Sequence, residues 1–334
     1  MQTNDFNYQV LLDSISILLE EGRNQVSHSV NTILLHTYWQ VGQYIVEYEQ
    51  RGNQKAEYGS FLFDHLSRDL TSRCGKGFSR SNLLYMRKLY LEFPIRETVS
   101  HVLSWSHYFE ILKSDHTLEI QFYTKQCEKE KWSVRELKRQ MKSMLYHRIA
   151  RGKDKKAILN LSTRGQEILQ PSDILKDPFV LEFLKIPEHV AYLESELEEK
   201  IISNLQHFLL ELGKGFTFEK RQYRISIGGK HFYVDLVFYH RILKCFVLID
   251  LKRGEVNHQD VGQMNLYLNY FKKEINLPED NDPIGIVLGA HQNQVLVEYA
   301  TESIDNQLFV SKYQLYLPEK KLIIDELNKH MYDE

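Results

Sequence analysis

The sequence has few of the residues that would build a covalent frame or a membrane span. Its three cysteines, Cys74, Cys127 and Cys245, are far apart and form no CxxC pair, so we expect neither a disulfide frame nor a structural zinc site. No window reaches the roughly 20 apolar residues that a bilayer-spanning helix needs. The N-terminus has no basic segment followed by an apolar run. We therefore expect a soluble, cytoplasmic protein with no membrane partner.

The chain also lacks an excess of either charge. It has 42 Lys and Arg against 45 Asp and Glu among its 334 residues. This near balance gives no global attraction to a polyanion, so a nucleic acid would have to be met by local patches. With 43% hydrophobic residues, the chain is long enough for two domains that each have a core.

The first part of the chain has helical periodicity. Apolar residues recur every three or four positions from Phe6 to about Tyr146, which predicts an all-α domain over residues 1–150. Ser79 and the sequence SVRE at 133–136 are typical helix starts, and Pro94 should close the helix that Ser79 opens. The charged segment 151–175 has weaker periodicity, and we interpret it as a linker to a second domain over 176–334.

Basic residues cluster in this helical half. Residues 68–96 contain seven basic and two acidic side chains, and residues 130–156 contain ten and three. A helix, a glycine-bearing turn and a second helix resemble a helix-turn-helix, so Arg80, Arg87 and Lys88 are predicted to bind DNA. The alternative is a solvated charged face, which is the more general property of such helices.

Beyond the linker, the pattern changes to strands and helices in alternation. The runs that predict strands are rich in aromatic and β-branched residues. The expected elements are a helix over 189–213 closed by Gly213, strands at 216–227, 230–240 and 244–252, a helix at 259–275, strands at 283–290 and 294–300, and a helix at 319–331.

Gly228 and Gly229 predict a two-residue hairpin turn between the first two strands. In such a hairpin, facing residues have numbers that sum to 457, so Gln222 lies opposite Asp235. The period of two then predicts one shared apolar face formed by Phe232, Val234, Leu236 and Phe238.

A second tight turn near residues 240–244 would place Asp235 opposite Asp250, with Cβ atoms about 5 Å apart. Lys252 lies two residues after Asp250, on the same face of its strand. Two carboxylates within apolar segments require a nearby cation. Mg²⁺, or Mn²⁺ as an alternative, would answer this need, with Lys252 orienting or deprotonating a water or stabilising charge on a phosphate. The plainer alternative is a pair of solvated strand ends, with Lys252 paired to one aspartate.

A helix glutamate would complete such a metal site. Glu194 lies within the apolar stripe of the preceding helix and Glu198 at its border, so the residues leave both open. In the later helix, Gln263 shares a polar face with Asp260 and Tyr267. Gln263 is predicted to reach a phosphate or water, with a capped or solvated face as the alternative.

The order of these features resembles the PD-(D/E)XK nuclease pattern: a helix glutamate, Asp235, then Asp250-Leu251-Lys252, and a helix with Gln263. Longer strings are similar to the YhcG-type family of nuclease-like proteins, namely FLLELGKGF, RQYRISIGGKHFYVDLVFYHRILKCFVLIDLKRGE, GQMNLYL and IGIVLGA. TYWQVGQYI, GFSRSNLLYMRKLY, LSWSHY and WSVRELKRQM are similar to the N-terminal domain of that family.

This resemblance implies an α/β C-terminal domain with a mixed central sheet of the restriction-endonuclease-like kind, after an all-α N-terminal domain for which a winged-helix-like form is an alternative. It implies Mg²⁺ and a nucleic acid substrate. Asp235, Asp250 and Lys252 take the catalytic positions, and Glu198, our choice for the helix glutamate, joins Asp235 and Asp250 as a metal ligand. Val234 stands where the pattern has proline, and Asp250 is shorter than the glutamate of this group.

We therefore expect a Mg²⁺-dependent endonuclease acting on DNA, with RNA as a less favoured substrate because no residue suggests a reader of the 2′-hydroxyl. The alternative is a DNA-binding or complex-forming protein whose nuclease-like core is not catalytic. A homodimer is left open beside a monomer.

Overall fold

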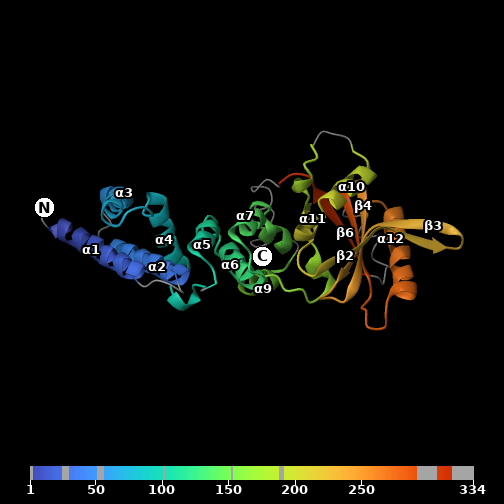
Figure 1. Cartoon of the computed structure of the whole chain (residues 1–334), viewed down its shortest axis with the longest axis horizontal. Coiled ribbons are helices and arrows are strands. Elements are labelled where there is room, and N and C mark those ends of the chain that lie inside the picture. Colours follow the sequence, from blue (N-terminus) through green and yellow to red (C-terminus); the bar gives the residue numbers. More distant parts are fainter. Residues whose placement is uncertain are drawn as a thin grey trace. The chain divides into compact units, whose positions relative to one another are not determined.

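The computed structural model (Figure 1) describes residues 3–24, 30–50, 56–100, 102–151, 153–187, 192–291 and 307–317. The chain divides into two compact units. The first comprises Met1–Met141 with Ile158–Gly165, and the second comprises Lys142–Ala157 with Gln166–Glu334. No helix among the described residues is long and apolar enough to cross a membrane.

The N-terminal unit is built from helices, as the periodicity predicts. Its buried core comes mainly from the first four helices, and it includes Ile15, Val41, Leu66 and Met86. Gly42 allows a close helix contact, because a Cβ there would lie 2.1 Å from the Met86 carbonyl oxygen. The helices are α1 (Thr3–Asn24), α2 (Val30–Gln50), α3 (Ala56–Cys74), α4 (Arg80–Glu92), α5 (Trp105–Ile111), α6 (Thr117–Glu130) and α7 (Val134–Lys142), with a 3-10 turn at Arg96–Thr98.

The two predicted helix starts are confirmed. The Ser79 hydroxyl accepts a hydrogen bond from the backbone N–H of Asn82 at the start of α4. The Ser133 hydroxyl accepts one from the N–H of Glu136 at the start of α7. The predicted helix, turn and helix are present as α3, residues 75–79 and α4. The described residues of this unit form no strand, so they contain no β-wing.

The segment that we interpreted as a linker differs from a plain connection. It contains α9 (Lys155–Arg164) and a 3-10 turn at Pro171–Ile174. Ile158 and Leu161 are buried, three residues apart on one face of α9, and this burial explains why the segment is helical despite its charge. Upstream, α8 (Leu145–Ala150) belongs to the C-terminal unit and is buried throughout.

The described residues of the C-terminal unit form one mixed sheet of six strands. Its order is β1-β6-β5-β4-β3-β2, with antiparallel pairing from β2 to β4 and parallel pairing from β4 to β1. The strands are β1 (Phe179–Val180), β2 (Phe216–Ile227), β3 (Lys230–His240), β4 (Cys245–Glu255), β5 (Ile284–His291) and β6 (Gln307–Gln314). The helices are α10 (Glu194–Ser203), α11 (Leu205–Leu212) and α12 (His258–Tyr270), with a π-helical turn at Phe271–Ile275 and a 3-10 turn at Glu182–Leu184.

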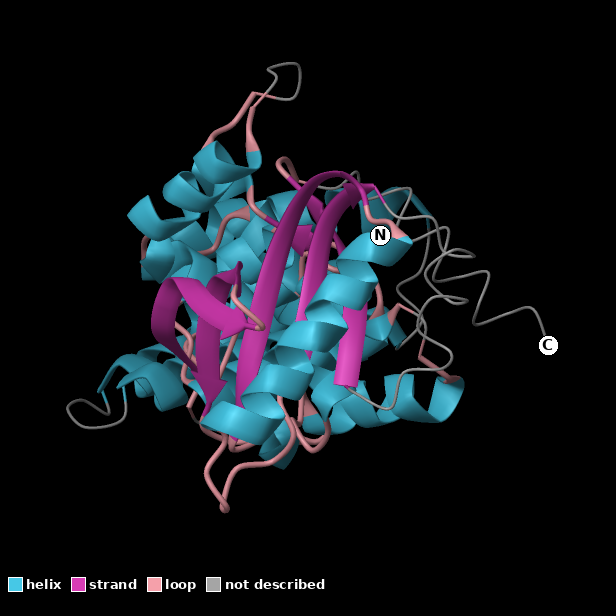
Figure 2. Cartoon of the chain, turned by 90° about the vertical axis from the view of Figure 1, so that its right-hand side faces the viewer, coloured by secondary structure: helices cyan, strands magenta, loops and turns pink. Residues whose placement is uncertain are grey.

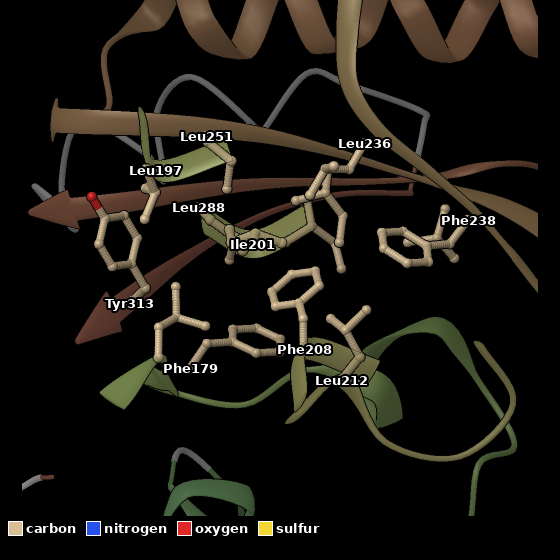
Figure 3. Packing of buried hydrophobic residues seen from close by; sticks show 14 of the residues in the cluster. Phe179, Leu197, Ile201, Phe208, Leu212, Leu236, Phe238, Leu251, Leu288 and Tyr313 are labelled. Atoms are coloured by element: carbon tan, nitrogen blue, oxygen red, sulfur yellow. The ribbon is translucent and has the colours of Figure 1, made fainter. Parts of the chain in front are cut away.

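Helices cover both faces of this sheet. One core joins α10 and α11 to the strands, and Figure 3 shows Leu197 and Ile201 of α10 beside Leu251 and Leu288 of the sheet. A second core joins α12 to the sheet through residues such as Val261. In Figure 2 the strands lie side by side and a helix crosses the face turned to the viewer. The central strands β4 and β5 are therefore buried on both sides over most of their length, as an α/β fold requires.

Several predicted elements are corrected by the structure. The single helix expected over 189–213 is two helices, because Asn204 leaves the helical conformation (φ −120°, ψ 29°) and its side-chain amide donates to the Lys200 carbonyl. Gly213 ends α11 at φ +107°, as predicted. Strands β1 and β6 were not predicted. The strand predicted at 294–300 and the helix predicted at 319–331 lie outside the described residues.

Candidate active site

The hairpin registers place the two aspartates side by side. The numbers of paired residues in β2 and β3 add up to 457 from Ile227↔Lys230 to Lys220↔Val237, as predicted. Paired residues of β3 and β4 sum to 485 from His240↔Cys245 to Leu236↔Ile249, and Asp235 and Asp250 also sum to 485. An oxygen of Asp235, Oδ2, accepts a hydrogen bond from the Leu251 N–H at 2.8 Å. Asp235 is therefore held against the strand that carries Asp250.

The pleat of the hairpin reverses at Gln222 and Asp235, and this corrects the apolar face that we predicted. Val234 packs in the core beneath α12, with Phe232 against it, whereas Leu236 and Phe238 pack in the core beneath α10 and α11. Gln222 has a left-handed backbone (φ +47°), and the pairs on either side of it keep the same register. The side chains of the hairpin therefore change faces at the left-handed residue, and no extra residue is inserted there in either strand.

The same reversal links β2 to α10. Arg221, on one side of it, lies 3.0 Å from the buried Glu198 of α10, measured from Nε to Oε1. Tyr223, on the other side, packs its ring against Phe271 beyond α12. Between them, Gln222 Nε2 donates to Glu198 Oε2 at 2.5 Å and to Asp235 Oδ1 at 3.1 Å. Glu198 and Asp235 therefore share one amide group.

Of the two candidate glutamates, Glu198 lies nearer to the aspartates. Glu198 is 4% exposed, and burial raises the pKa of its carboxyl, with Asp235 adding to the effect and the Gln222 hydrogen bond opposing it. Glu194 is exposed and accepts a hydrogen bond from the Arg253 N–H at the end of the site.

Asp250 is a buried carboxylate with incomplete compensation. It is 2% exposed. Burial, and then the neighbouring Asp235, raise the pKa of Asp250 to about 7, although Lys252 acts in the opposite direction. Oδ2 of Asp250 lies 2.8 Å from Lys252 Nζ, but no described residue gives it a hydrogen bond of good geometry. The interpretation of Asp250 as a solvated strand end is thus wrong, whereas its pairing with Lys252 is present.

Lys252 stands among three acidic side chains. Its Nζ is also 3.7 Å from Asp260 Oδ1 at the start of α12. Burial alone would lower the pKa of Lys252, but the charge of Asp250, and more weakly that of Glu194 and Asp260, raises it above its ordinary value. The ammonium group is therefore protonated at neutral pH.

Gln263 contacts the site through a tyrosine. Its side-chain amide donates to the Tyr267 hydroxyl, and that hydroxyl donates to the Tyr233 carbonyl at 3.0 Å. Burial raises the pKa of Tyr267 to about 12, although the Gln263 hydrogen bond lowers it. This chain of contacts fixes α12 to β3 two residues before Asp235.

The basic residues predicted to bind DNA each have an acidic partner within the N-terminal unit. Arg80 lies 3.4 Å from Asp64, and Arg87 lies 2.7 Å from Glu49. Lys88 lies 2.8 Å from an Asp115 oxygen and donates to the Ser114 carbonyl. Their contact with DNA stays a prediction, and it requires that phosphates compete with these partners.

A hard cation fits the donor chemistry of the site. Glu198, Asp235 and Asp250 supply carboxylate oxygens of the kind that Mg²⁺ prefers. Oε1 of Glu198 and Oδ2 of Asp250 are buried and lack a well-aligned hydrogen bond from any described residue. As the described side chains stand, however, no group of three or more His, Cys, Asp or Glu residues is arranged to hold a metal. Arg221 lies 3.0 Å from the first of these oxygens and Lys252 lies 2.8 Å from the second, so both side chains must move for a cation to reach them, and Gln222 must move from the other oxygen of Glu198.

The contacts that join Glu198 to the hairpin were not predicted from the sequence. The register placed Gln222 opposite Asp235, but nothing suggested that its amide also reaches Glu198. Arg221 was not singled out. No local pattern marks Arg221, because the reversal beside it depends on the left-handed backbone of Gln222.

The sheet and its helices have the form of a PDDEXK nuclease domain, and residues 172–329 match the family described as YhcG PDDEXK nuclease domain. Residues 14–148 match the DUF1016 N-terminal domain. The chain is 37% identical over 352 residues to "Putative nuclease YhcG" of Escherichia coli strain K12, covering 96% of this chain and 93% of the relative. The chain therefore belongs to the YhcG nuclease family, which confirms the resemblance.

Solved structures give more distant likenesses. One is a repair endonuclease from Pyrococcus abyssi, at 20% identity and a TM-score of 0.28, over 40% of this chain and 50% of that one. Another is EndoMS in a complex with double-stranded DNA, at 21% identity and a TM-score of 0.27, over the same shares of the two chains. Each match spans about half of the solved chain.

Proposed function

We propose that this protein is a Mg²⁺-dependent nuclease that hydrolyses phosphodiester bonds of DNA, with Glu198, Asp235 and Asp250 as the metal ligands. The observation that carries the proposal is the state of Asp250. Asp250 is 2% exposed and lies beside a second carboxylate, and Lys252 at 2.8 Å offsets its charge only in part, so a further cation would stabilise the site. Membership of a nuclease family supports the same conclusion.

A bound divalent cation would supply Lewis acidity at the phosphate and would lower the pKa of a water. Asp235 and Asp250 would orient that water from two adjacent strands. Lys252 is protonated, so it would donate a hydrogen bond to a phosphate oxygen or to the attacking water rather than remove a proton. Gln263 would act with Tyr267 to hold β3 in place.

DNA is the proposed substrate, with the basic residues Arg80, Arg87 and Lys88 holding its backbone. A double-stranded DNA complex is known for EndoMS, a distant likeness on which the choice of DNA does not depend. RNA is the competing substrate, and the protein is proposed to act in the cytoplasm as a monomer or homodimer.

One observation favours a second candidate, a non-catalytic DNA-binding protein. Among the described residues the carboxylates are engaged by Gln222, Arg221 and Lys252, and no group of three is arranged to hold a metal. In that case the same contacts would be permanent structural pairs, and divalent cations would not bind.

A cleavage assay separates the two functions. Single-stranded, duplex and branched DNA, and RNA of the same sequences, are incubated with wild type, Asp250→Asn and Lys252→Met, with Mg²⁺ or with EDTA. Ser226→Ala, an exposed position on the same hairpin, is the matched control.

We expect Mg²⁺-dependent cleavage of DNA by wild type and Ser226→Ala, and losses of about 10³-fold in the other two variants, which corresponds to about 4 kcal/mol. Thermal unfolding would check that each variant is folded. Equal activity in all four proteins, or none in wild type, would contradict the proposal.

A further inference from the structure

Gln222 is the side chain through which Glu198 and Asp235 meet. Its Nε2 lies 2.5 Å from Glu198 Oε2 and 3.1 Å from Asp235 Oδ1, so a single nitrogen bridges two carboxylates. Both protons of the amide are thereby used. An amide carries only a partial positive charge at these protons, so it hydrogen-bonds the two carboxylates without neutralising either of them.

The backbone of Gln222 is strained in favour of this contact. Its φ of +47° lies in the left-handed region, which glutamine seldom adopts, and it falls within an otherwise regular ladder. Backbone strain of this kind persists where surrounding structure holds it, and it gathers at functional sites. Here its consequence is visible, because the pleat reversal at this residue brings Arg221, Gln222 and Asp235 to Glu198.

We propose that Gln222 is a placeholder for the metal: its amide occupies the position between Glu198 and Asp235 until a divalent cation displaces it. This inference rests on the proposed function, since it assumes that the two carboxylates are ligands. The amide keeps the two carboxylates close together and weakens the repulsion between them, while Arg221 pairs with the other oxygen of Glu198. It also competes with the cation, so Gln222 sets the affinity of the site for metal.

The competition between the Gln222 amide and the cation predicts the direction in which metal affinity changes when the side chain is removed. A site that is competent only when the amide has moved away binds metal with an affinity reduced by the fraction of molecules in the competent state. Removal of the side chain should therefore weaken the metal-free protein and tighten metal binding. Removal of a merely structural residue would instead lower both the stability and the metal affinity, because the ligands would lose order.

The experiment is a Mn²⁺ titration of the full chain, followed by the electron paramagnetic resonance signal of free Mn²⁺. Gln222→Gly removes the amide and suits the left-handed backbone. Gln222→Asn also tolerates that backbone but is one methylene shorter, so it provides a second variant if the glycine variant fails to fold. Ser226→Ala, on the same strand and exposed, is the matched control, and Asp250→Asn removes a proposed ligand.

We expect Mn²⁺ to bind about tenfold more tightly to Gln222→Gly than to wild type, with a smaller gain in Gln222→Asn and no change in Ser226→Ala. Without Mn²⁺, Gln222→Gly should unfold at a lower temperature than wild type, and Mn²⁺ should recover the difference. If both Gln222 variants bind Mn²⁺ no more tightly than a wild type that does bind it, the proposal for Gln222 is wrong and the proposed function stands. Absence of binding in wild type would overturn the proposed function as well.

Discussion

Glu211 and Asp250 are both buried carboxylates in the C-terminal unit, and their surroundings differ in how fully the charge is met. Glu211 Oε1 lies 2.6 Å from Arg148 Nη1 and accepts the Val180 N–H at 3.0 Å. Burial alone would raise the pKa of Glu211, but Arg148 and Lys176 lower it below its ordinary value. Asp250, by contrast, has a pKa of about 7 because burial and Asp235 outweigh Lys252.

The difference is the one that we expect between a structural charge and a proposed metal ligand. The Arg148 guanidinium uses four of its five N–H donors, since it also donates to the Ser143 carbonyl and hydroxyl and to the Pro178 carbonyl. It joins α8 to β1 and α11 at zero exposure of both charged side chains. The Asp250 region keeps an excess of negative charge and buried oxygens without well-aligned donors. A protein retains such a region at a loss of stability, and a ligand of positive charge explains why.

Removal of Arg148 should have the largest effect on stability. Arg148→Ala leaves Glu211 charged and buried with no guanidinium, so the C-terminal unit should lose about 3–5 kcal/mol in its free energy of unfolding. Urea unfolding, followed by far-ultraviolet circular dichroism, measures this change. The double variant Arg148→Met/Glu211→Leu should regain most of the loss, because it removes both charges. A loss below about 1 kcal/mol would show that the pair is not the structural contrast to Asp250.

The substitution Asp250→Asn should raise the free energy of unfolding, whereas Arg148→Ala lowers it. The pKa of Asp250 in the folded protein is about 7, above its ordinary 3.8. Ionisation therefore destabilises the fold increasingly as pH rises from about 4 to 7, and by a constant amount above pH 7. At pH 8 in EDTA, the neutral asparagine should stabilise the protein by roughly 2–4 kcal/mol.

Thermal unfolding at matched pH values checks this sign. The gain should shrink steadily toward pH 4, where the aspartate of wild type is protonated as well. An asparagine variant less stable than wild type at pH 8 would show that Lys252 compensates Asp250 as fully as Arg148 compensates Glu211.

The ion pairs of the N-terminal helices should give the smallest effects on stability. Arg80 and Arg87 form partly exposed pairs, which typically contribute less than about 1 kcal/mol each. Their predicted function is to bind phosphates, so the triple variant Arg80→Ala/Arg87→Ala/Lys88→Ala should weaken DNA binding and reduce the slope of log affinity against log salt by about 2–3. Fluorescence anisotropy at several salt concentrations measures the slope. An unchanged slope would show that these residues do not bind phosphates and form only a solvated charged face.

Much of the candidate site was predictable because it depends on local rules. The Gly228-Gly229 turn adopts φ +56° and +78°, and that turn with its period of two is sufficient to place Gln222 opposite Asp235. The short connection after His240 likewise brings Asp235 against Asp250. Tight turns set register without reference to the rest of the fold, so sequence patterns carry this information.

The remainder depends on contacts that no local pattern encodes. Glutamine has no preference for the left-handed region, so the reversal at Gln222, and with it the split of Val234 from Leu236, is visible only in the structure. Strand β6 pairs in parallel with β5 and buries Leu308 and Tyr313. Its sequence mixes polar and apolar residues, so no pattern predicts this strand. The break at Asn204 similarly follows from a side-chain hydrogen bond within a pattern that is helical throughout.

The measurement that tests the account most directly is an anomalous difference map from crystals of the protein soaked in Mn²⁺. We predict a Mn²⁺ peak bounded by the carboxylates of Glu198, Asp235 and Asp250, with the Gln222 amide moved away from Glu198. A map without a peak at these carboxylates, with Gln222 still bridging Glu198 and Asp235, would contradict the claim that this part of the hairpin is a metal site.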